Sequence, residues 1–140
     1  MDTLIPAPSP VIMLIEDDAG FTYLVQRYAR RSGCQMVSTR LGIDALAFAQ
    51  QTQPAVIVLD VAFPGTASWD MLKALKADRA TRDIPVVMCS GLEQEARGLE
   101  AGAEVCLSKP VMYYDFLTAL ADAGVNLSAS VKREASQISD

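Results

Sequence analysis

Residues 55–59 have the sequence AVIVL, an unbroken apolar run that leads directly into the carboxylate of Asp60. Residues 11–15, VIMLI, have the same form and lead into Glu16, Asp17 and Asp18. Continuous apolar runs, as opposed to alternating ones, are typical of strands that are buried on both faces, as in a parallel sheet covered by helices. We therefore expect both segments to be central strands of such a sheet.

Three more short runs complete the set of expected strands. Residues 84–89 lead into Ser90, and residues 105–107 are followed closely by Lys109. Residues 35–39 are more polar, which indicates an edge strand. Polar groups thus follow the apolar runs, at the edge of the sheet where ligands of open α/β proteins bind.

The segments between these runs carry apolar residues at helical spacing. From Phe21 such residues recur at intervals of three and four, up to a stop signal at Gly33. The other expected helices are residues 43–50, 69–77, 93–101 and 112–123. The helix over 93–101 has a weak apolar face and contains Gly98, which favours a mobile element. The alternation of strand and helix predicts a doubly wound α/β sheet.

The composition excludes several classes of function. The chain has 140 residues, 12 Lys and Arg, 17 Asp and Glu, no His and a net charge of −5. This length predicts one domain, and the acidic balance argues against nucleic-acid binding. The absence of His excludes Ser-His-Asp and Cys-His catalysis. The three cysteines form no CxxC pair and are expected to be free thiols. No apolar run approaches the ~20 residues of a membrane span, so we expect a soluble, cytoplasmic protein without membrane insertion.

The expected sheet brings carboxylates together. If the strand ends converge, Glu16, Asp17 and Asp60 form a cluster that is unfavourable unless it is protonated or bridged by a cation. A hard ion with oxygen ligands, such as Mg²⁺, suits this cluster. Ser90 adds a hydroxyl and Lys109 a cation. Carboxylates, metal, hydroxyl and lysine together favour phosphoryl transfer, with a carboxylate as the nucleophile.

Four motifs in this order resemble the receiver domain of bacterial response regulators: IEDD at 15–18, VLDVAFPG at 58–65, VMCSG at 87–91 and SKP at 108–110. The resemblance implies a flavodoxin-like, five-stranded parallel sheet of strand order 2-1-3-4-5 with helices on both faces. It predicts a receiver domain over residues 11–124. Residues 1–10 are then a disordered or extended segment, and residues 125–140 a polar tail.

The resemblance also implies roles for individual residues. Asp60 matches the phosphoacceptor, Ser90 the switch hydroxyl and Lys109 the cation that binds the phosphoryl group. The implied ligands of Mg²⁺ are Glu16, directly or through water, Asp17, Asp60 and the backbone carbonyl of Ala62. The bond before Pro110 is usually cis in this family.

A few positions depart from the family pattern. Cys106 stands where the family usually has an aromatic residue that moves with the hydroxyl, and Ser68 stands in place of a usual glycine. Ala62 and Leu92 occupy positions that tune the lifetime of the phosphoryl group. Their apolar side chains cannot orient an attacking water, which predicts slow self-dephosphorylation.

The function that follows is that of a single-domain response regulator in a two-component phosphorelay. A histidine kinase or histidine phosphotransfer protein would phosphorylate Asp60, and the fourth helix, fifth strand and fifth helix would signal to a downstream protein. Such a protein is no enzyme beyond its own phosphorylation and dephosphorylation, and is a monomer or weak homodimer. A piece of a longer protein would have the same sequence. The alternative is a receiver-like interaction module that works without phosphorylation, which Cys106 and Ser68 favour.

Overall fold

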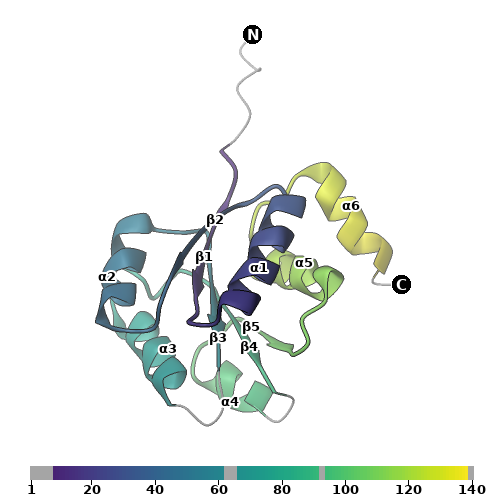
Figure 1. Cartoon of the computed structure of the whole chain (residues 1–140). Helices are drawn as coiled ribbons and strands as arrows, with labels where there is room; N and C mark the ends of the chain where they lie inside the picture. The colour runs from purple at the N-terminus through teal and green to yellow at the C-terminus, as the bar shows by residue number, and fades with distance from the viewer. Residues whose placement is uncertain (1–7, 62–65, 92–93, 139–140) are drawn as a thin grey trace.

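The computed structural model describes residues 8–61, 66–91 and 94–138 and contains one five-stranded parallel sheet (Figure 1). Its strand order is β2-β1-β3-β4-β5, which confirms the predicted order and the edge position of β2. The strands are β1 (Val11–Ile15), β2 (Gln35–Thr39), β3 (Val56–Asp60), β4 (Val86–Ser90) and β5 (Val105–Ser108). The strands β3 and β4 extend one residue beyond the predicted runs, so that Asp60 and Ser90 are their last residues.

Helices cover both faces of the sheet. The helices α1 (Ala19–Arg31) and α5 (Tyr113–Asp122) pack on one face, and α2 (Ile43–Thr52) and α3 (Ala67–Ala77) on the other. The short helix α4 (Glu95–Glu100) lies on the same side as α3, where its Gly98 approaches Met88 of β4. Among the described residues, no helix combines the length and the apolar character that a membrane span requires.

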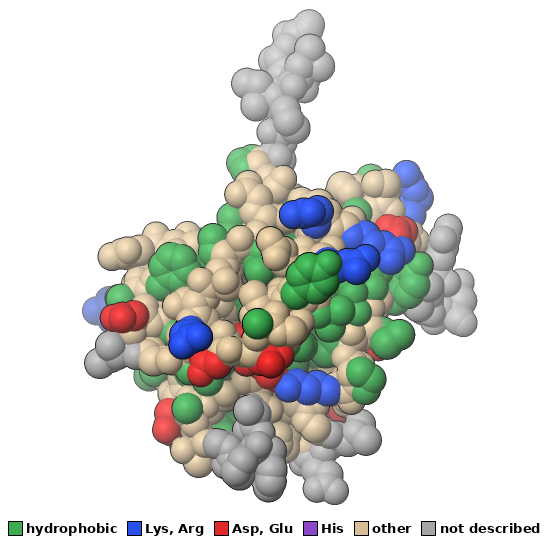
Figure 2. Space-filling view, viewed as in Figure 1, with side chains coloured by type: hydrophobic (Ala, Val, Ile, Leu, Met, Phe, Trp, Pro, Cys, Tyr) green, Lys and Arg blue, Asp and Glu red, His purple; other side chains and the backbone are tan. Residues whose placement is uncertain are grey.

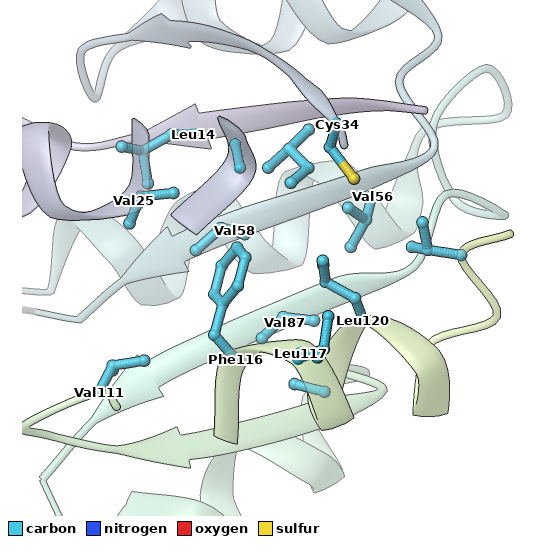
Figure 3. Packing of buried hydrophobic residues seen from close by; sticks show 14 of the residues in the cluster. Leu14, Val25, Cys34, Val56, Val58, Val87, Val111, Phe116, Leu117 and Leu120 are labelled. Carbon is cyan, nitrogen blue, oxygen red and sulfur yellow. The ribbon is translucent and has the colours of Figure 1, made fainter. Parts of the chain in front are cut away.

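The core explains why the β3 run is apolar without interruption. Successive side chains of a strand point to opposite faces. Ile57 therefore joins the cluster under α2 and α3, while Val58 joins the cluster under α1 and α5. Figure 3 shows Phe116 of α5 lying over Val58 in this second cluster. Each such side chain stabilises the fold by about 1.5–3 kcal/mol through burial.

The C-terminal segment differs from the predicted polar tail. It forms a sixth helix, α6 (Ala129–Ile138), which packs against α5 (Figure 1). Val125, Leu127 and Val131 are buried and belong to the core cluster of α1 and α5. The fold therefore continues past residue 124, because three apolar side chains spread over a polar segment suffice to dock it.

One polar contact also reaches α6. The Arg31 guanidinium lies 3.9 Å from the centre of the Tyr113 ring and forms an ion pair of 3.7 Å with Glu134 of α6. At the other end of the chain, residues 1–7 of the predicted N-terminal segment lie outside the described residues, and residues 8–10 have no regular structure.

Candidate functional site

The carboxyl ends of four strands bring most of the predicted site residues to one edge of the sheet. Parallel pairing sets Ile15 beside Leu59, Asp60 beside Cys89, and Ser90 beside Ser108. Glu16, which follows Ile15, thus comes next to Asp60. In Figure 2, acidic side chains gather at the centre of the visible face, with basic side chains beside them.

Asp60 is the most enclosed acidic group of the site. Its residue is 6% exposed, and its carboxylate forms an ion pair with the Lys109 ammonium. The Lys109 side chain is 38% exposed and lies 5.4 Å from the centre of the Phe21 ring. A buried carboxylate is costly without a counter-charge, and the Lys109 ammonium supplies that counter-charge.

Glu16 lies against Asp60 and is half-buried. One carboxylate oxygen, Oε1, accepts hydrogen bonds from the backbone N–H groups of Asp17 at 2.8 Å and Asp18 at 3.0 Å. The other, Oε2, is buried and has no hydrogen-bond partner. Burial, and then the adjacent Asp60 carboxylate, raise the pKa of Glu16 from 4.5 to about 7. The protein thus holds two carboxyl groups side by side at an energetic cost.

Asp17 departs from the expected cluster. Its carboxylate is exposed, and its Oδ1 accepts a hydrogen bond of 3.0 Å from the Leu41 N–H, in the loop after β2. Within residues 8–61, 66–91 and 94–138, no three Asp, Glu, Cys or His side chains are grouped so that they could hold a metal ion. In this conformation Glu16 and Asp60 meet, whereas Asp17 holds the Leu41 N–H, so the assignment of all three carboxylates to one metal site stays a prediction.

The site nevertheless fits a hard divalent cation in part. The partnerless Glu16 Oε2 and the adjacent Asp60 carboxylate are oxygen ligands of the kind that Mg²⁺ prefers. A cation between them would also remove the repulsion that raises the Glu16 pKa. The Leu41 N–H engages only one oxygen of Asp17, Oδ1, so this carboxylate could join the site through its other oxygen. Ala62, the predicted donor of a backbone carbonyl, lies outside the described residues.

Ser90 and Lys109 are joined through the backbone. The Lys109 N–H donates a hydrogen bond of 3.0 Å to the Ser90 carbonyl. Ser90 is buried, with 1% of the residue exposed. Its Oγ donates a hydrogen bond of 3.2 Å to the Gly91 carbonyl, not to Asp60. The peptide bond between Lys109 and Pro110 is cis, as expected.

Ser68 is a site residue that the sequence did not reveal as one. Its Oγ donates a hydrogen bond of 2.7 Å to the backbone carbonyl of Asp60, and it is 3% exposed. In the sequence Ser68 is only a departure from a usual glycine. No spacing rule signals a hydroxyl that reaches back from the second residue of a helix to the end of the preceding strand.

Cys106 takes part in a close contact with α4. Its Sγ donates a long hydrogen bond of 3.6 Å to the Glu95 carbonyl. A Cβ on the buried Gly98 would lie 2.7 Å from this sulfur, closer than such atoms approach. Gly98 therefore allows α4 to sit tightly on β4 and β5, which contrasts with its interpretation as a sign of mobility.

Comparison with known proteins agrees with this arrangement. The family model of the response regulator receiver domain matches residues 12–121. The chain is 29% identical to the polar-differentiation response regulator DivK of Brucella ovis over 109 residues, 76% of this chain and 89% of DivK. It is 34% identical to the DNA-binding dual master transcriptional regulator RpaA of Synechocystis over 104 residues, 72% of this chain. That match spans only 43% of RpaA.

A solved structure shows the same fold. The receiver domain of a sensor histidine kinase from Pseudomonas aeruginosa, with a magnesium ion coordinated in its active site cleft, superposes with a TM-score of 0.72 at 21% identity. The superposition covers 84% of this chain and 99% of that domain. Because the family model matches residues 12–121, which are most of this chain, the chain belongs to the response regulator receiver domain family.

Proposed function

We propose that this protein is a phosphoryl-accepting response regulator of a two-component phosphorelay, with Asp60 as its phosphoacceptor. The observation that carries the proposal is the buried Asp60 carboxylate, ion-paired with Lys109 and flanked by Glu16. A purely structural carboxylate needs one counter-charge, whereas a second acid beside it lowers the stability of the fold without adding a structural contact. Such a cost is typical of a functional site.

The reaction follows from the positions of these groups. A carboxylate oxygen of Asp60 attacks the phosphorus of a phosphohistidine, the P–N bond breaks, and the released imidazole takes up a proton from water. The product is an aspartyl phosphate. The Lys109 ammonium stays beside the oxygens that carry the transferred charge.

The proposed metal ligands are Glu16, Asp17, Asp60 and the backbone carbonyl of Ala62. When bound, Mg²⁺ would offset the negative charge of the phosphoryl group and of the carboxylates. The magnesium ion in the cleft of the Pseudomonas aeruginosa receiver domain supports this assignment. The buried, partnerless Glu16 Oε2 of this chain supports it independently.

The phosphoryl donor lies outside these 140 residues. The chain contains no histidine, so it cannot carry the phosphohistidine itself. We expect a histidine kinase or a histidine phosphotransfer protein in the cytoplasm as the donor. The protein then catalyses only its own phosphorylation and dephosphorylation, and acts as a monomer or weak homodimer.

The proposed output surface is formed by α4, β5 and α5. A groove of about 790 Å³ runs along it, with an apolar part from Leu99, Val105 and Leu107. Its acidic lining residues are Glu95, Glu104, Asp115 and Asp122, and none of the described residues that line it is Lys or Arg. A downstream protein that brings apolar and basic side chains would fit this surface. The backbone link from Ser90 to Lys109 connects it to the site.

The experiment that tests the function is direct phosphorylation. The protein is incubated with Mg²⁺ and a small-molecule phosphodonor, and its intact mass is compared with that of Asp60→Asn. We expect one phosphoryl adduct on the native protein and none on the variant. A native protein without an adduct, beside a receiver domain that is labelled under the same conditions, would refute the proposal.

A second candidate function is a receiver-like interaction module that works without phosphorylation. The tight packing of Gly98 on Cys106 favours it, because a closely packed α4 resists displacement. In that case Asp60→Asn would bind the downstream partner as the native protein does, with or without phosphodonor.

A further inference from the structure

We propose that Ser68 is a positioning residue for Asp60: its hydroxyl holds the backbone of the phosphoacceptor in the orientation that phosphorylation requires. This inference rests on the proposed function, and it concerns a residue at which the chain departs from the family's usual glycine. Ser68 Oγ donates a hydrogen bond of 2.7 Å to the Asp60 carbonyl, and both residues are buried.

The hydrogen bond completes a clamp on one peptide group. The carbonyl of Asp60 and the N–H of Val61 belong to the same rigid, planar peptide unit. Ser68 holds the carbonyl, and the Cys89 carbonyl of β4 accepts a hydrogen bond of 2.8 Å from the Val61 N–H. The unit is therefore fixed from α3 on one side and from β4 on the other.

The clamp acts on the side chain through Cα. Asp60 is the last residue of β3, so beyond it the sheet holds the backbone only through the hydrogen bond from the Val61 N–H to the Cys89 carbonyl. The orientation of the peptide that follows sets the direction of the Cα–Cβ bond, and hence the approach of the carboxylate to Lys109. A small displacement of a reacting group is expensive in rate, which makes this orientation relevant to catalysis.

Ser68 could instead serve only to anchor α3, and the chain offers a matched control for that role. Thr81 Oγ1 donates a hydrogen bond of the same 2.7 Å length to the Leu75 carbonyl, near the other end of α3, and Thr81 is fully buried. Both are hydroxyls that anchor α3 through a backbone carbonyl. Only Ser68 holds the phosphoacceptor.

The test compares Ser68→Ala with Thr81→Val, which remove the two hydroxyls with little change in volume. The rate of phosphorylation by a small phosphodonor is measured over a range of Mg²⁺ and donor concentrations. The exchange rate of the Val61 amide proton is measured by NMR without donor or metal. The fluorescence of Trp69, the only tryptophan, reports unfolding of each variant.

We expect Ser68→Ala to lower the maximal phosphorylation rate about five- to tenfold, as the loss of a buried hydrogen bond and of alignment predicts. The Val61 amide of this variant should exchange faster. Thr81→Val should lose a similar amount of stability but should change neither the phosphorylation rate nor the Val61 exchange rate. Ser68→Thr, which retains the hydroxyl, should restore the rate. If Ser68→Ala does not fold, Ser68→Cys, with a weaker donor of similar size, takes its place.

Two results would overturn the inference. One is a rate and a Val61 exchange in Ser68→Ala that equal those of the native protein. The other is an equal loss in Thr81→Val, which would make both effects a matter of stability. If the native protein itself takes up no phosphoryl group, the proposed function fails. In that case the Val61 exchange still decides whether Ser68 clamps the Asp60 peptide.

Discussion

The Lys109 ammonium, just after β5, forms an ion pair with the carboxylate of Asp60 at the end of β3, across the intervening strand β4. The pair is asymmetric, because the Asp60 side chain is 5% exposed and the Lys109 side chain 38%. Loss of the lysine would leave the aspartate buried without a counter-charge. Loss of the aspartate would leave a lysine that water can still reach.

This asymmetry leads to a prediction for Lys109→Met. The substitution should lower the free energy of unfolding by about 1–2 kcal/mol, less than for a fully buried pair because Lys109 is partly exposed. In an Asp60→Asn background the same substitution should have almost no effect, since no charge remains to be compensated. Urea unfolding of the four proteins measures both values. An equal loss in both backgrounds would contradict the pairing.

The raised pKa of Glu16 predicts a pH dependence of stability in metal-free buffer. The folded protein holds a proton on Glu16 up to about pH 7, whereas the unfolded chain releases it near 4.5. Between these values the folded state binds more protons, so its stability falls as the pH rises from 4.5 to 7. Below 4.5 and above 7, Glu16 contributes no slope.

Unfolding by urea at pH 5 and pH 8 checks this prediction. Glu16→Gln should flatten the decline, whereas Glu100→Gln, on the exposed side of α4, should leave it unchanged. Mg²⁺ should stabilise the native protein more at pH 8 than at pH 5, because it competes with the proton for the same carboxylates. A decline that is as steep in Glu16→Gln as in the native protein would assign it to other groups.

The docking of α6 predicts that the C-terminal segment contributes to stability. Leu127 is 4% exposed in the core cluster, whereas Leu99 on α4 is 47% exposed. Leu127→Ala should therefore lower the free energy of unfolding by about 2–4 kcal/mol. The same change at Leu99 should cost less than about 1 kcal/mol. Equal effects at the two positions would show that the segment leading into α6 does not pack on the domain in solution.

The strands could be predicted from the sequence, and the reason is burial. The first four residues of β3, Val56 to Leu59, are all buried, and no polar residue interrupts them. The change from such an apolar run to a charged residue marks the carboxyl end of the strand, and this change identified the position of Asp60. The pattern was weaker for α6: of its described side chains only Val131 belongs to the core cluster, and the apolar residues of ASVKREASQI stand apart among polar ones.

The details of the site were not predictable in the same way. The orientation of Asp17 depends on the Leu41 N–H, which comes from a loop 24 residues further along the chain. The role of Ser68 depends on a carbonyl of a residue eight positions earlier. Both contacts come from how neighbouring elements pack, which residue type and spacing do not encode.

The contact between Gly98 and Cys106 leads to the last prediction, for Gly98→Ala. Alanine has the higher helix propensity by about 1 kcal/mol, so a solvent-facing position would gain stability from this change. Here the added Cβ would lie 2.7 Å from Cys106 Sγ and closer still to Met88 Cε, and overpacking should lower the free energy of unfolding by about 1–3 kcal/mol. Cys106→Ala removes the sulfur and should recover part of the loss. Gly91→Ala, where no atom lies within 4 Å of the new Cβ, is the matched control in thermal unfolding. A more stable Gly98→Ala protein would mean that α4 stands away from β5, and that this surface is free to move.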